Sequence, residues 1–100
     1  MARRPRGLSL CLFVAGNSPE SVVAMTNLEA LFPAAERSQV QIEIVDVQRD
    51  PARAASDRII VTPTLLKVAP APQCRILGSL RNRDALIRLL EIEIPAEENS

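Results

Sequence analysis

The sequence predicts an α/β fold in which a strand–helix–strand half precedes two further strands and a last helix. The first half rests on a largely apolar run at residues 8–15, a helical pattern from Pro19 and a strand-like pattern of spaced apolar residues at residues 40–47. The second half rests on short strand-like segments at residues 64–68 and 75–78, followed by a leucine-rich helical pattern. A strand, helix and strand of these lengths predict a right-handed βαβ unit with parallel strands.

The opening run, residues 8–15, is almost wholly apolar, which is typical of a central strand covered on both faces. Ser18 then stands at an N-cap position, and Pro19 follows at the first helical position, where its missing N–H costs nothing. Pro33 is expected to end or bend this helix. The apolar residues of the helix recur at helical spacing: Ala24, Leu28, Leu31 and Ala35.

The second half opens with the same pair of signals. Asp50 is a candidate N-cap, and Pro51 starts a short helix that should end near Asp57. A proline-containing turn separates the two short strands. Asn82 is expected to cap the last helix, and Pro95 to stop it.

Length and composition indicate one small domain. The chain has 100 residues, of which 47% are hydrophobic, and a net charge of zero, which argues against nonspecific nucleic-acid binding. We expect a single domain at residues 8–94, a flexible basic N-terminus at residues 1–7 and an acidic flexible tail at residues 95–100. The apolar runs are too short to span a membrane and no signal peptide is evident, so we expect a cytoplasmic protein.

The sequence favours binding over catalysis. It contains no histidine, which removes the commonest general base and metal ligand. Cys11 and Cys74 are too far apart in sequence for a redox motif or a zinc knuckle, and Cys11 lies within an apolar strand. The carboxylates are scattered. We therefore predict no catalytic residues, no metal, no cofactor and no enzymatic activity.

A strand, a turn and a helix, paired with a proline at the head of a later strand, resemble the ground plan of thioredoxin-like domains. Pro63, between Thr62 and Thr64, is in the place of the cis-proline of such folds; the alternative is an ordinary trans proline that shields a strand end. Thioredoxin-like enzymes place a Cys-x-x-Cys motif on the first turn, whereas the turn from Asn17 to Ser21 has no thiol.

The chain also resembles the KaiB family of circadian clock proteins, over a region from about Leu8 to Leu90. Four ordered motifs carry the resemblance: Ala15 to Ser21; Val45 to Val47 with Asp50 and Pro51; Thr62 to Leu65 with Lys67, Pro70 and Pro72; and Arg75 to Gly78. The sensor domain of the histidine kinase SasA shares this fold, but the segment from Pro70 to Pro72 favours KaiB.

This resemblance implies a non-enzymatic regulator that binds the ATPase and kinase KaiC and modulates its phosphorylation cycle in a clock, timer or stress-linked system. The alternatives are an adaptor or sensor module for a histidine kinase, and a redox protein, against which the thiol-free turn argues. A homodimer or homotetramer is compatible with the family. The residues expected to bind the partner are Asn17, Ser18, Pro19, Arg58, Lys67 and Arg75, although the three basic residues could also form only a solvated face.

KaiB-like proteins are known for two folds, a tetrameric ground state and a thioredoxin-like monomer that binds KaiC, and the half after about Pro51 differs between them. Leu89 replaces a glycine of cyanobacterial members, which favours the helix of the thioredoxin-like state. Alternating residues at 91–94 favour a strand and the ground state. The positions expected to matter for the fold switch or as cis prolines are Pro63, Pro70, Pro72, Gly78 and Leu89.

Glu43 departs from the family in a second way. Family members often carry lysine here, on the surface that binds KaiA in cyanobacterial clocks. Because Glu43 reverses that charge, we expect that KaiA is not a partner.

Overall fold

The computed structural model describes residues 7–32 and 40–89. The element order confirms the predicted α/β arrangement, with boundaries within a few residues of those expected. The predicted flexible ends (apart from Gly7), the strand-like residues 91–94 and the stop at Pro95 lie outside the described residues. The elements are β1 (Leu8–Val14), α1 (Pro19–Leu31), β2 (Val40–Asp46), α2 (Pro51–Ser56), β3 (Thr64–Ala69), β4 (Cys74–Leu77) and α3 (Arg83–Leu89).

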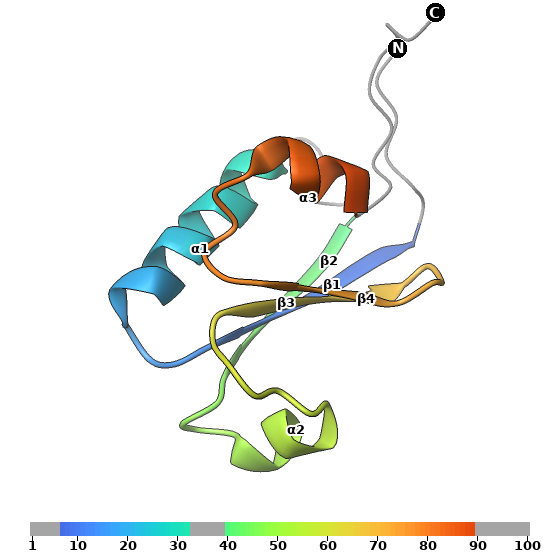
Figure 1. Cartoon of the computed structure of the whole chain (residues 1–100). Helices are drawn as coiled ribbons and strands as arrows, with labels where there is room; N and C mark the ends of the chain where they lie inside the picture. The colour runs from blue at the N-terminus through green and yellow to red at the C-terminus, as the bar shows by residue number, and fades with distance from the viewer. Residues whose placement is uncertain (1–6, 33–39, 90–100) are drawn as a thin grey trace, which may run out of the picture.

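The four strands form one sheet in the order β2-β1-β3-β4. β1 and β2 are parallel, as the predicted βαβ unit requires, whereas β3 runs antiparallel to β1 and β4 antiparallel to β3. Figure 1 shows α1 and α3 together on one face of the sheet and α2 on the other side. The architecture is thioredoxin-like.

β1 is central because its side chains build two apolar clusters, one on each face of the sheet. Its even-numbered residues pack with Leu28 and Phe32 of the α1 region and with Leu86 of α3. Its odd-numbered residues Cys11 and Phe13 pack on the α2 face in a smaller cluster. This two-sided burial explains why the run from residue 8 to residue 15 is almost wholly apolar.

The start of α1 follows the predicted capping pattern. Ser18 is the N-cap, and its Oγ accepts a hydrogen bond from the Ser21 backbone N–H at 3.3 Å. Ser18 Oγ also donates to Ser21 Oγ at 2.8 Å, and Ser21 Oγ accepts from the Ala15 N–H at 3.1 Å. These bonds fix the direction in which the chain leaves β1 and enters the helix.

The segment before β3 has the predicted cis-proline. The Thr62–Pro63 bond is cis, Pro63 is buried, and its carbonyl accepts a hydrogen bond from the Gly78 N–H at 2.9 Å. Ala69–Pro70 and Ala71–Pro72, in the connection from β3 to β4, are cis as well. Within residues 7–32 and 40–89, no helix has the length and apolarity needed to cross a bilayer.

Candidate partner-binding face

The C-terminal end of α2 is closed by a Schellman motif, in which two backbone N–H groups beyond the helix bond back to its last turn. The Ile59 N–H donates to the Ala54 carbonyl at 2.9 Å, and the Arg58 N–H donates to the Ala55 carbonyl at 3.1 Å. Arg58 occupies the left-handed position of this motif, with φ of 57°, where glycine is the usual residue. The motif leaves the Arg58 side chain exposed to solvent.

Arg75 reaches from β4 to the end of α2. Its Nη1 donates to the Arg58 carbonyl at 3.0 Å, and its Nη2 donates to the Asp57 carbonyl. A guanidinium with fixed, parallel N–H groups suits the two adjacent carbonyl oxygens of Asp57 and Arg58, which directly follow the helix. Because both acceptors are neutral, these bonds leave the positive charge of Arg75 uncompensated.

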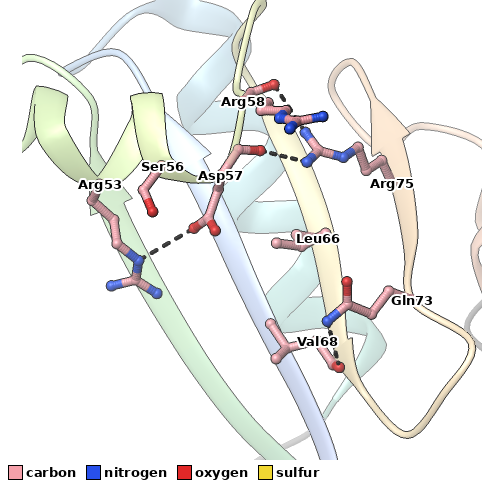
Figure 2. Close-up of a pocket in the computed structure, with 8 residues that line it drawn as sticks. All are labelled: Arg53, Ser56, Asp57, Arg58, Leu66, Val68, Gln73 and Arg75. Atoms are coloured by element: carbon pink, nitrogen blue, oxygen red, sulfur yellow. Dashed lines mark hydrogen bonds and ion pairs between the residues drawn. The ribbon is translucent and has the colours of Figure 1, made fainter.

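A pocket of about 400 Å³ lies between α2 and the β3–β4 pair. Figure 2 shows Leu66 and Val68 of β3 at the bottom of this pocket and polar side chains around it, with Arg75 and Gln73 opposite the α2 residues. Gln73 Nε2 donates to the Val68 carbonyl at 3.4 Å. Arg58 and Arg75 of this rim were expected from the sequence, but Arg53, Ser56, Asp57 and Gln73 were not, because they carry no local motif.

Arg53 is the pocket cation whose charge is neutralised. It makes two bonds to the Glu43 carboxylate, at 2.8 and 2.9 Å, and its Nε donates to Asp57 Oδ2 at 3.3 Å. These contacts lower the pKa of Glu43, chiefly through the hydrogen bonds from Arg53, and raise the pKa of Arg53. Among the described residues, no carboxylate pairs with Arg58 or with Arg75, so these two residues hold the pocket's uncompensated positive charge.

The turn between β1 and α1 presents Asn17 and Pro19 to solvent, with Ser18 partly covered. One carboxylate oxygen of Asp46, Oδ1, accepts hydrogen bonds from the Gly16 N–H at 3.1 Å and from the Gln48 N–H at 2.9 Å. The end of β2 therefore holds this turn in place. The turn lies at the end of β1 where Phe13 pairs with Thr64, next to the segment that carries Pro63.

Lys67 does not lie with Arg58 and Arg75, contrary to their expected grouping. Its side chain is only 1% exposed, and it alternates with Leu66 and Val68, which line the pocket. Lys67 therefore points to the α1–α3 face of the sheet, while the two arginines lie on the α2 face. The period-2 alternation of β3 could have revealed this separation from the sequence.

The other residues expected at fold-switch positions are at or near element ends. Pro70 and Pro72 lie in the β3–β4 connection, and Gly78 directly follows β4 with φ of 98°, a backbone conformation that glycine adopts readily. Leu89 is the last described residue of α3. The described part of the segment expected to be helical in the thioredoxin-like arrangement, up to Leu89, is helical here.

The two cysteines lie on opposite faces of the sheet. Cys11 is buried on the α2 face, and its pKa is raised to about 11, first by desolvation and then by the nearby Glu43 carboxylate. Cys74 pairs with Lys67 in the β3–β4 ladder and so faces the other side of the sheet. Over the part of the chain that the structure describes, no three potential metal ligands lie together.

These features define the class of protein: a thioredoxin-like domain without a thiol on its first turn. Mitochondrial thioredoxin 3 of Saccharomyces cerevisiae superposes with a TM-score of 0.68 at 18% identity, covering 88% of this chain and 80% of that chain. The N-terminal domain of Synechococcus elongatus SasA superposes with a TM-score of 0.60 at 24% identity, covering 89% of this chain and 85% of that domain. These likenesses establish the fold alone.

Sequence comparison identifies the family. Residues 11–92 match the KaiB domain. Circadian clock oscillator protein KaiB of Thermostichus vulcanus is 39% identical over 83 residues, 83% of this chain and 77% of the relative. The KaiB of Microcystis aeruginosa is 37% identical over 93 residues, 90% of this chain and 89% of the relative. The chain belongs to the KaiB family.

Proposed function

We propose that this protein binds a KaiC-type ATPase and kinase and modulates its phosphorylation cycle in a clock, timer or stress-linked system. The observation that carries the proposal is the KaiB domain match over residues 11–92, together with relatives named as circadian clock oscillator proteins. The thioredoxin-like arrangement supports it, because this is the family state to which KaiC binding is attributed. The protein acts as a regulator and not as an enzyme, and we place it in the cytoplasm.

The docking face combines the β1–α1 turn with the end of α2. Asn17, Ser18 and Pro19 present the turn, and Arg58 and Arg75 supply positive charge that no described carboxylate offsets. Uncompensated charge at the rim of an interface accelerates association with an oppositely charged partner. Lys67 is left out of this face because it is buried on the other side of the sheet.

The test is co-purification with the KaiC-type hexamer encoded in the same genome, in the presence of nucleotide. We expect a stable complex that Arg58→Glu and Arg75→Glu each weaken, mainly through slower association and an altered salt dependence. Arg88→Glu, which reverses an exposed charge on α3, is the matched control and should bind as wild type does. A wild-type protein that fails to bind the hexamer under any nucleotide condition would refute the proposed function.

Two competing functions give different results in the same preparation. A histidine-kinase adaptor, suggested by the SasA-like fold, would bind a kinase and not the KaiC-type hexamer. A redox protein would reduce insulin disulfides, which requires an accessible thiolate; the buried Cys11 with its raised pKa does not offer one. We also infer that KaiA is not a partner, because Glu43 and its Arg53 counter-ion replace the lysine expected there.

A further inference from the structure

Two segments distant in sequence run beside each other on the α2 face. Arg75 on β4 donates to the Arg58 carbonyl, which ties the start of the loop before β3 to β4. At the next step along the sheet, Leu77 pairs with Thr64, and the Gly78 N–H bonds to the Pro63 carbonyl. The loop before β3 and the end of β4 therefore form one continuous surface.

This surface carries large apolar side chains that the fold leaves uncovered. Ile60 is 91% exposed, Leu77 is 64% exposed and Val61 is 47% exposed. Single exposed apolar residues are ordinary, but neighbouring ones rimmed by charge mark interaction sites. We call Ile60, Val61 and Leu77 the apolar strip.

The apolar strip is held in place by the fold. The Val61 carbonyl accepts a hydrogen bond from Thr64 Oγ1 at 2.7 Å, which secures the loop to the start of β3. Leu77 lies on the same side of β4 as Arg75, since side chains two residues apart on a strand share a face. The backbone that carries the apolar strip is thus ordered, and the uncompensated charges of Arg58 and Arg75 lie beside the strip. Little further ordering of the loop is therefore needed on binding.

We propose that the apolar strip is the centre of the partner-binding surface, and that it receives an apolar side chain flanked by carboxylates on the KaiC-type partner. This inference rests on the proposed function and assigns residues to it. The commitment to an acidic occupant comes from charge complementarity, because Arg58 and Arg75 have no carboxylate partner among the described residues. An apolar centre with a charged rim is the usual anatomy of a specific interface.

The strip and its rim should affect different rate constants. Removing an apolar centre shortens the lifetime of a complex, because most interface substitutions act on dissociation. Reversing a rim charge changes association and its dependence on salt. Apolar-strip variants should therefore dissociate faster while keeping the wild-type salt dependence.

The experiment measures binding to the KaiC-type hexamer by surface-immobilised kinetics at several salt concentrations. We expect Ile60→Ser and Leu77→Ser each to weaken binding about tenfold, equivalent to about 1.4 kcal/mol, through faster dissociation. Ile44→Ser is the matched control, because Ile44 is another exposed isoleucine, 46% exposed against 91% for Ile60, but lies on β2. Circular dichroism and melting temperature verify that all three variants fold.

The outcomes separate this inference from the proposed function. If wild type binds, Arg58→Glu weakens binding and both apolar-strip variants bind as wild type does, the strip is no part of the interface and the inference fails alone. Equal weakening by Ile44→Ser would likewise overturn it, because the effect would then not be specific to the strip. If wild type shows no binding, the proposed function fails and the inference fails with it.

Discussion

Arg58 combines an exposed, uncompensated charge with an unfavourable backbone conformation. Its φ of 57° is in the left-handed region, which costs an ordinary L-residue about 1–2 kcal/mol relative to the right-handed conformation. Glycine is the common residue at this position of a Schellman motif because it has no Cβ. An arginine here is consistent with selection for its charge on the proposed docking face and not for stability.

We therefore predict that Arg58→Gly stabilises the protein while weakening partner binding. The free energy of unfolding should rise by up to about 1 kcal/mol, since relief of the left-handed strain is partly offset by the greater chain entropy of glycine. Urea denaturation measures the first effect and KaiC-type binding the second. Arg58→Asn, which also tolerates this conformation, is the control, and a clear loss of stability in both variants would contradict the argument.

Cys11 gives the protein a stability that depends on pH in the alkaline range. Its pKa is raised from 9.0 to about 11, mainly by burial, so the folded state keeps the thiol protonated where the unfolded chain releases the proton. A raised acid pKa contributes stability below pH 9 that is lost as the pH rises toward 11. We expect the free energy of unfolding to fall across this window.

The measurement is urea denaturation of wild type and Cys11→Ala between pH 8 and pH 11. Cys11→Ala is less stable throughout because it shortens a buried side chain, but its decline with pH should be shallower. The chain contains no tyrosine, so phenol ionisation does not obscure the comparison. Parallel curves for the two proteins would show that Cys11 titrates alike in both states.

At the scale of elements, α2 is held by side chains from both edges of the sheet. A six-residue helix is too short to be stable alone, and Ala54 is its only residue classed as buried. Arg53 ties the helix to Glu43 on β2, while Arg75 on β4 binds the carbonyls at its end. Glu43, where the KaiB resemblance implies a lysine, is thus a structural partner of α2.

This arrangement predicts that Glu43→Lys loosens α2. Lysine removes the carboxylate and places a like charge beside Arg53, so α2 amides should exchange with solvent faster and the melting temperature should fall slightly, since exposed ion pairs are screened. The lowered pKa of Glu43 means its contribution is present above the ordinary value of 4.5 and is lost as the pH falls below it. The charge swap Glu43→Lys with Arg53→Glu should restore part of the protection, and failure of the swap to do so would rule out the ion pair as the cause.

The elements could be predicted from the sequence because their signals are local. Ser18 with Pro19, Asp50 with Pro51, and the alternation or continuity of apolar residues each act within a few positions. The contacts of Arg53 with Glu43 and of Arg75 with Arg58 could not be predicted from the sequence. The two residues of each pair are ten and seventeen positions apart and belong to different parts of the fold. Only the folded sheet brings β2 and β4 to opposite sides of α2.

At the scale of the whole molecule, the two halves meet around β1. The α1–α3 face joins Leu28 of the first half to Leu86 of the second, and Asn27 Nδ2 on α1 donates to the Ser79 carbonyl before α3 at 2.9 Å. The helical form of residues 83–89 is therefore part of the thioredoxin-like core. A change that disfavours this helix should act on the arrangement of the entire second half.

Leu89→Gly is the corresponding prediction. Glycine in a helix is about 1 kcal/mol less favourable than alanine, so the variant weakens α3. Glycine is also the residue that the KaiB resemblance implies at this position. If the chain has access to the family's second arrangement, a change of about 1 kcal/mol shifts the ratio of the two states roughly fivefold away from the thioredoxin-like form. Backbone NMR at low micromolar concentration measures both populations, and Leu89→Ala is the control that keeps helix propensity high.

Because docking is proposed for the thioredoxin-like state, the affinity of Leu89→Gly for the KaiC-type partner should fall as the population of that state falls. The size of the loss is set by the fraction of binding-competent molecules. A variant whose spectrum and affinity both match wild type would show that tertiary contacts around β1, and not the propensity of α3, decide the arrangement of the second half.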